Sequence, residues 1–202
     1  QKGNYAVGAF NVENMEMVKA VLAAAEELHA PVMLQTTPST VKYGTLETFA
    51  AIVAAEAEKV SVPVCLHLDH GNSFELAVQA MKAGYTSVMI DGSHEDFEGN
   101  VAITKKVADV AKAFGVPVEA ELGKVGGKED DLEAEADTNT DPQEAKEFVE
   151  RTGVTSLAIA IGTAHGFYAG TPVLDKERVS DVKNSFLHHW FFTEHPVLVK
   201  KM

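Results

Sequence analysis

Five ionisable side chains stand at or just after apolar runs of this chain, where they could bind a divalent cation and move a proton. They are Asp69, His70, Asp91, Glu121 and His165. The imidazole nitrogens of the two histidines and the carboxylate oxygens of Asp91 and Glu121 are ligands that zinc and similar ions accept. Asp69 precedes a candidate ligand but points differently along the chain, which suits a proton donor or acceptor beside a metal. One Asp–His pair alone would indicate a helix cap or a loop end, whereas the recurrence of such groups favours a site.

A polar stretch at residues 123–140 could cover such a site. It begins with glycines that allow a hinge, so it is interpreted as a loop that acts as a mobile lid, from which Glu129 could swing in as a base. The alternative is a solvated run of charges, and this reading is preferred for residues 133–137.

Two histidines need a separate interpretation. Small residues surround His165 in residues 162–166 (GTAHG). They would let backbone N–H groups approach a phosphate oxygen, and a plain tight turn explains them equally well. His67, in the strand that precedes Asp69, is expected to be a packed histidine or a partner of a metal ligand, and not a ligand itself.

Strand and helix patterns alternate along the chain and would position these groups. The expected strands are residues 5–12, 31–35, 62–68, 86–90, 116–122 and 155–161, and the expected helices are residues 15–29, 46–59, 74–83, 100–114, 142–152 and 175–184. The strands are apolar on both faces, as in a parallel sheet that helices cover. Six βα units in series fit both a doubly wound sheet and a (β/α)₈ barrel.

In either fold, function gathers at the carboxyl ends of the strands. Asn11 lies at the end of the first expected strand, and Thr36 and Thr37 follow the second. The ionisable groups named above follow the later strands. Each successive strand therefore delivers a polar group to the same edge of the sheet.

Composition narrows the class of protein. The 202 residues suffice for one domain with a sizeable core, and the net charge of −13 disfavours nucleic acid or an anionic membrane as the main partner. No apolar run is long enough to span a bilayer, and the N-terminus lacks a signal-peptide layout. The single cysteine, Cys65, is interpreted as a small buried hydrophobe, and a cytoplasmic location is expected.

Five ordered motifs resemble the class II fructose-bisphosphate and tagatose-bisphosphate aldolases. They are residues 9–12 (AFNV), 66–71 (LHLDHG), 89–94 (MIDGSH), 119–123 (EAELG) and 161–166 (IGTAHG). The resemblance implies a (β/α)₈ TIM barrel with a catalytic zinc, a phosphorylated ketose as substrate and a homodimer or homotetramer. It covers residues 5–183.

The resemblance also implies a role for each matching residue. Asp69 would transfer the proton of the C4 hydroxyl, and Glu129 would remove a proton from dihydroxyacetone phosphate. Zinc would be bound by His70 and His165, and Asp91 and Glu121 would hold a second monovalent or divalent cation or an alternative position of the zinc. The substrate would contact Asn11, Thr37 and the backbone of Gly166.

The carboxyl-terminal part departs from the family pattern. The family places a third histidine ligand and a phosphate loop after its seventh strand, and neither is recognised here. We therefore expect a single, incomplete barrel domain over residues 1–202, C-terminally truncated or frameshifted, with a tail at 184–202 unlike the family.

Three hypotheses follow from this sequence. The first is a zinc-dependent aldolase that acts on fructose or tagatose 1,6-bisphosphate, with residues 92–94 and Ala169 leaning toward tagatose. The second is a non-catalytic truncated homologue without the third zinc ligand. The third is another metal-dependent barrel lyase or isomerase.

Overall fold

Six parallel strands form one sheet in the part of the chain that the structure describes. The computed structural model describes residues 5–123, 126–129, 132–134, 139–165, 171 and 173–185, with the backbone alone at 126–129, 132–134 and 164–165. The strands of the sheet are β1 (Gly8–Asn11), β2 (Val32–Thr36), β3 (Val64–Leu68), β4 (Ser87–Ile90), β5 (Val118–Leu122) and β8 (Ser156–Ile159). They are hydrogen-bonded in this order, each parallel to the next.

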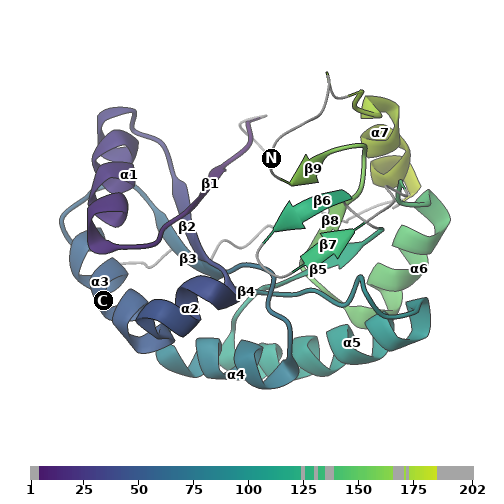
Figure 1. Cartoon of the computed structure of the whole chain (residues 1–202), viewed down its shortest axis with the longest axis horizontal. Helices are drawn as coiled ribbons and strands as arrows, with labels where there is room; N and C mark the ends of the chain where they lie inside the picture. The colour runs from purple at the N-terminus through teal and green to yellow at the C-terminus, as the bar shows by residue number, and fades with distance from the viewer. Residues whose placement is uncertain are drawn as a thin grey trace.

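Helices surround the curled sheet in an arc that runs from α1 to α7 (Figure 1). The helices of the described residues are α1 (Met15–Glu27), α2 (Pro38–Gly44), α3 (Leu46–Ala57), α4 (Phe74–Ala83), α5 (Phe97–Phe114), α6 (Pro142–Thr152) and α7 (Lys176–Ser185). The sequential strand order decides between the two expected folds, because a doubly wound sheet reverses its strand order part-way. The sheet is a partial barrel of the TIM type.

The strands in the middle of the sheet lie in the hydrophobic core. β3 and β4 are buried at every position, which confirms the expectation from their two apolar faces. Tyr85, Phe49 and Phe148 are the largest fully buried side chains. Burying an aromatic side chain of this size contributes roughly 1.5–3 kcal/mol. The two edge strands differ from the centre, since β1 is exposed and β8 is half-buried at all positions.

Two of the expected helices, α4 and α6, begin after a residue with a capping side chain. Ser73 caps α4 by accepting a hydrogen bond from the Leu76 amide, and Asp141 caps α6 through the amides of Gln143 and Glu144. No helix among the described residues combines the length and the apolar character that a membrane crossing requires.

The polar stretch at 123–140 is not a loop without secondary structure, so that prediction is wrong. It contains β6 (Gly126–Glu129) and β7 (Leu132–Ala134), which pair antiparallel. β6 also pairs with β9 (Ala164–His165), and together they form a second, three-stranded sheet. The strands went unrecognised because their residues are mostly polar or glycine and show no alternation of apolar side chains.

Candidate metal and proton-transfer site

The carboxyl ends of β3, β4 and β5 meet at one edge of the sheet, hereafter the C-terminal edge. The β3 ladder continues past Leu68, because the Asp69 amide donates to the Thr36 carbonyl at 2.9 Å. His70 then adopts a left-handed backbone with φ +46°. Such strain in a residue other than glycine persists only where surrounding contacts fix it, and it is frequent at functional sites.

Close packing of the backbone brings the ends of β3 and β4 together. The Asp91 amide donates to the Gly71 carbonyl at 2.9 Å. A Cβ atom on Gly71 would collide with the carbonyl oxygen of Met89, so only glycine allows this approach. The sequence LHLDHG thus places His70 beside Asp91.

Three side chains form a group that can hold a cation. His70 Nδ1 lies 2.9 Å from Asp91 Oδ2 and 3.9 Å from Glu121 Oε2, and one ligand atom from each residue lies within 4.8 Å of the others. One imidazole nitrogen and two carboxylate oxygens suit zinc and related divalent ions, which bind such atoms at about 2.0–2.2 Å. The chemistry of these three residues therefore fits a divalent metal ion.

The two carboxyl groups of this trio differ in pKa. Burial raises the pKa of Asp91, but hydrogen bonds from His70 and Ser93 outweigh burial and bring it to about 2. Burial raises the pKa of Glu121 to about 8, and the charge of Asp91 adds to this shift. At neutral pH the metal-free trio therefore holds one proton on Glu121, which a divalent cation would replace.

Asp69 is tied to strands β1 and β2 through Gln35. The amide nitrogen Nε2 of Gln35 donates to Asp69 Oδ2 at 2.6 Å and to Asn11 Oδ1 at 2.6 Å. Sequence reasoning missed Gln35. The available signal was an amide side chain near the carboxyl end of an apolar strand.

His67 lies beneath this group and is fully buried. Its Nδ1 is 2.8 Å from Ser87 Oγ, and its Nε2 is 3.4 Å from Glu119 Oε2. Burial lowers the pKa of His67 to about 3, so the ring is neutral. This is the packed histidine that the sequence predicted, and it is not one of the three side chains that could hold a metal ion.

Comparison with known proteins identifies the family. The family model described as fructose-bisphosphate aldolase class-II matches residues 1–198. The chain belongs to this family of class-II aldolases. It is 50% identical over 188 residues to a protein named probable fructose-bisphosphate aldolase from Bacillus subtilis, and this match covers 92% of the chain and 66% of the relative.

Two solved structures support the same assignment. The YdjI aldolase from Escherichia coli K12 is 41% identical with a TM-score of 0.81, over 91% of this chain and 65% of that one. A putative fructose-1,6-biphosphate aldolase from Coccidioides immitis is 32% identical with a TM-score of 0.84, over 91% of this chain and 66% of that one. The chain thus spans just under two thirds of the length of these relatives.

The remaining site residues of this aldolase-family chain fall into two groups. Thr37 is only 3% exposed, and its hydroxyl lies 3.2 Å from that of Thr40, which donates to Glu13 at 2.7 Å. The backbones of Glu129 and His165 lie in β6 and β9, where Gly127 pairs with His165. The side chains of Glu129 and His165, and the whole of Gly166, lie outside the described residues, as do Ala169 and most of the tail at 184–202.

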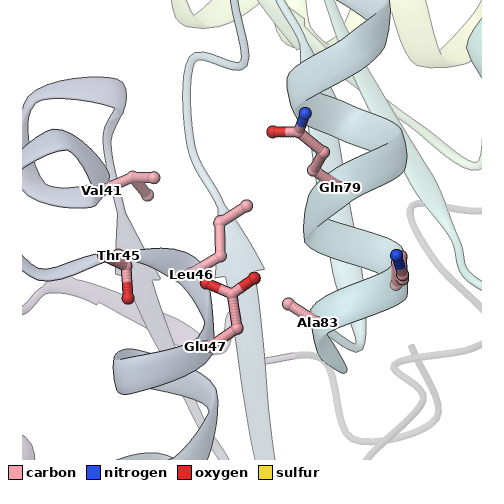
Figure 2. A pocket seen from close by; sticks show the side chains of 7 residues that line it. Val41, Thr45, Leu46, Glu47, Gln79 and Ala83 are labelled. Atoms are coloured by element: carbon pink, nitrogen blue, oxygen red, sulfur yellow. The ribbon is translucent and has the colours of Figure 1, made fainter.

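A cavity of about 590 Å³ lies apart from the C-terminal edge, between α2, α3 and α4 (Figure 2). Its lining residues are Val41, Thr45, Leu46, Glu47, Gln79, Lys82 and Ala83. None of the sequence-predicted site residues is among them. The cavity therefore plays no part in the chemistry argued from the trio.

Proposed function

We propose that this chain performs metal-dependent aldol cleavage and condensation of a ketose 1,6-bisphosphate. The products of cleavage are dihydroxyacetone phosphate and glyceraldehyde 3-phosphate. The observation that carries the proposal is the convergence of His70, Asp91 and Glu121 beside Asp69. Membership of the class-II aldolase family supports it.

The cation we propose is zinc, with His70 and His165 as its histidine ligands. Asp91 and Glu121 then hold an alternative position of the zinc or a second cation. When bound, zinc acts as a Lewis acid that polarises the substrate carbonyl. In the metal-free chain, the contact of His70 Nδ1 with Asp91 orients the imidazole ring.

Two carboxyl groups of the chain transfer the protons. In cleavage, Asp69 takes the proton of the C4 hydroxyl while the C3–C4 bond breaks and the aldehyde forms. The electron pair of that bond passes to the dihydroxyacetone phosphate half, which takes up a proton from Glu129. Asn11, Thr37 and the backbone of Gly166 bind the substrate.

The decisive experiment measures metal content and turnover of the purified chain. Zinc is quantified by mass spectrometry, and cleavage of fructose and tagatose 1,6-bisphosphates is followed with and without EDTA. We expect stoichiometric zinc and EDTA-sensitive cleavage of one of the two substrates. A folded chain that binds no zinc and cleaves neither substrate would refute the proposal and favour a non-catalytic homologue.

The family resemblance also supports a homo-oligomer, a dimer or a tetramer. Light scattering coupled to gel filtration of the zinc-loaded chain measures its mass. A monomer at micromolar concentration would contradict this part of the proposal.

A further inference from the structure

At the C-terminal edge of the sheet, one nitrogen atom of Gln35 contacts two other side chains. Its Nε2 lies 2.6 Å from both Asp69 Oδ2 and Asn11 Oδ1. The sheet makes this contact possible, because Asn11 of β1 lies opposite Gln35 of β2, and the Asp69 amide extends the adjoining ladder. These three residues come from three neighbouring strands or their ends, so their positions are set by the sheet.

The chemistry of the three groups fixes their orientation. An ionised carboxylate only accepts hydrogen bonds, so Asp69 must face the amide nitrogen of Gln35. The same nitrogen reaches Asn11, and the Asn11 atom that faces it must therefore be the carbonyl oxygen. The amide nitrogen of Asn11 is consequently turned away from Gln35.

The outward nitrogen of Asn11 is available to a ligand. Asn11 is exposed, and no acceptor among the described residues binds its Nδ2. The side chain thus offers two N–H donors next to Asp69. A group that binds two such donors is an oxygen acceptor, such as a carbonyl, hydroxyl or phosphate oxygen.

We propose that Gln35 is a positioning residue of the aldolase site. Through Nε2 it holds the Asp69 carboxylate in place for proton transfer and locks the Asn11 amide with its donors toward an oxygen of the phosphorylated ketose. This inference rests on the proposed function, because it assigns Asp69 the proton transfer and Asn11 a substrate contact.

A magnetic-resonance experiment tests the hydrogen bonds without any turnover. In the ¹⁵N-labelled zinc-loaded chain, the side-chain amide signals of Gln35 are identified by their loss in Gln35→Ala. Asn11→Ala and Asp69→Ala are each expected to shift these signals, and Gln79→Ala, an exposed glutamine on α4, is expected to leave them unchanged. Gln35 signals that stay the same in both site variants would overturn the proposal even if the chain is inactive.

Kinetics then test the two halves of the role separately. Gln35→Ala is expected to lower kcat through Asp69 and to raise KM through Asn11, with a combined loss of roughly 10–100-fold in kcat/KM, the range for losing hydrogen bonds to charged and neutral partners. Asn11→Ala is expected to raise KM. In the Asn11→Ala background, Gln35→Ala should lower kcat and leave KM nearly unchanged, because the two changes remove one shared contact.

Independent effects of the two substitutions on KM would overturn the proposed role of Gln35. If Gln35→Ala raises KM by the same factor with and without Asn11, the amide does not act through Asn11. Gln35→Glu keeps the side-chain shape but lacks donors, so it should be no more active than Gln35→Ala, and wild-type kcat/KM in this variant would also refute the proposal. If the unmodified chain cleaves neither bisphosphate, the proposed function fails, while the spectra still decide whether Gln35 holds Asp69 and Asn11.

Discussion

Three acidic side chains at the C-terminal edge of the sheet have different hydrogen-bond partners and surroundings. Asp91 accepts hydrogen bonds from His70 and the Ser93 amide and stays ionised, whereas Glu121 is buried beside that charge and keeps its proton. Asp69 is held by Gln35. A buried anion, a buried acid and a tethered carboxylate thus lie within one small region, as expected of a site that binds a cation and moves protons.

Replacing Asp69 should separate proton transfer from metal binding. Asp69→Ala removes the proposed proton carrier but none of the three cation-binding side chains, so kcat should fall by roughly 10²–10⁴-fold while zinc content is unchanged. Cleavage rates and zinc stoichiometry measure the two effects. Asp109→Ala, on the exposed face of α5, is the control. Retained turnover in Asp69→Ala would show that another group carries the proton.

Glu121 should make the metal-free chain less stable as the pH rises. Burial and the charge of Asp91 raise its pKa from 4.5 to about 8. Between these values the folded chain holds a proton that the unfolded chain has lost, so the free energy of unfolding falls by up to about 1.4 kcal/mol per pH unit. Buried His67, with its pKa lowered from 6.5 to about 3, has the opposite effect only below pH 6.5.

Urea unfolding in EDTA between pH 6.5 and 8 measures the effect of Glu121. Wild-type stability should fall over this window, and Glu121→Gln should reduce the slope. A smaller slope remains in that variant near pH 7, because burial and the charge of Asp69 also raise the pKa of Glu119 to about 7. The exposed Glu150→Gln serves as control, and equal slopes in Glu121→Gln and wild type would contradict the assignment.

At the scale of elements, helix α5 supports the end of β5 from outside the sheet. Asn100 is 2% exposed and donates from Nδ2 to the Glu121 carbonyl at 2.9 Å. Its Oδ1 accepts from the Thr104 hydroxyl at 3.1 Å. A helix on the outer layer therefore fixes the backbone of a proposed metal-binding residue on the inner layer.

Asn100→Ala should weaken both the fold and the cation site. It leaves the buried Glu121 carbonyl without this donor, which costs about 1–3 kcal/mol. Chemical unfolding measures the stability, and competition with a chelator measures zinc affinity, which should also fall. Thr104→Val is the matched control. It keeps the hydrogen bond from the Asn100 side chain to the Glu121 carbonyl, so it should retain most of the zinc affinity. Unchanged zinc binding in Asn100→Ala would mean that α5 does not position Glu121.

Elements with strong periodicity could be predicted from the sequence. The helix expected at 74–83 is α4 as observed, and its Ser73 cap is present, because apolar spacing and a capping hydroxyl are local signals. Helix α2 was missed, since seven residues beginning with Pro38 give no helical period. The hairpin of β6 and β7 was missed because its pairing is not encoded by apolar alternation.

The part of the site that depends on the order of strands along the chain could also be predicted from the sequence. The positions of Asp69, His70, Asp91 and Glu121 at strand ends follow from the order of strands, and three of these side chains do converge. The Gln35 contacts span 24 and 34 residues of sequence and depend on how strands lie side by side. Such contacts become visible only when the register of the sheet is known.

At the scale of the whole molecule, the described sheet has two unequal edges. In the described residues β1 and β8 each pair with one neighbour only. Phe10 of β1 is 49% exposed, and Tyr5 and Val7 just before the strand are 64% and 45% exposed. An apolar strand with unpaired backbone groups can pair with another chain and promote aggregation.

Phe10→Lys should therefore reduce aggregation of the chain more than it changes stability. A lysine on an edge strand opposes pairing with a second copy through charge, and the exposed position loses little buried area. Light scattering during slow heating at several protein concentrations gives the measurement. Phe114→Lys is a closely matched control, because Phe114 is also 49% exposed but lies at the end of α5. If both variants suppress scattering equally, added charge is the cause, and if only Phe10→Lys does so, the β1 edge is the surface through which copies associate.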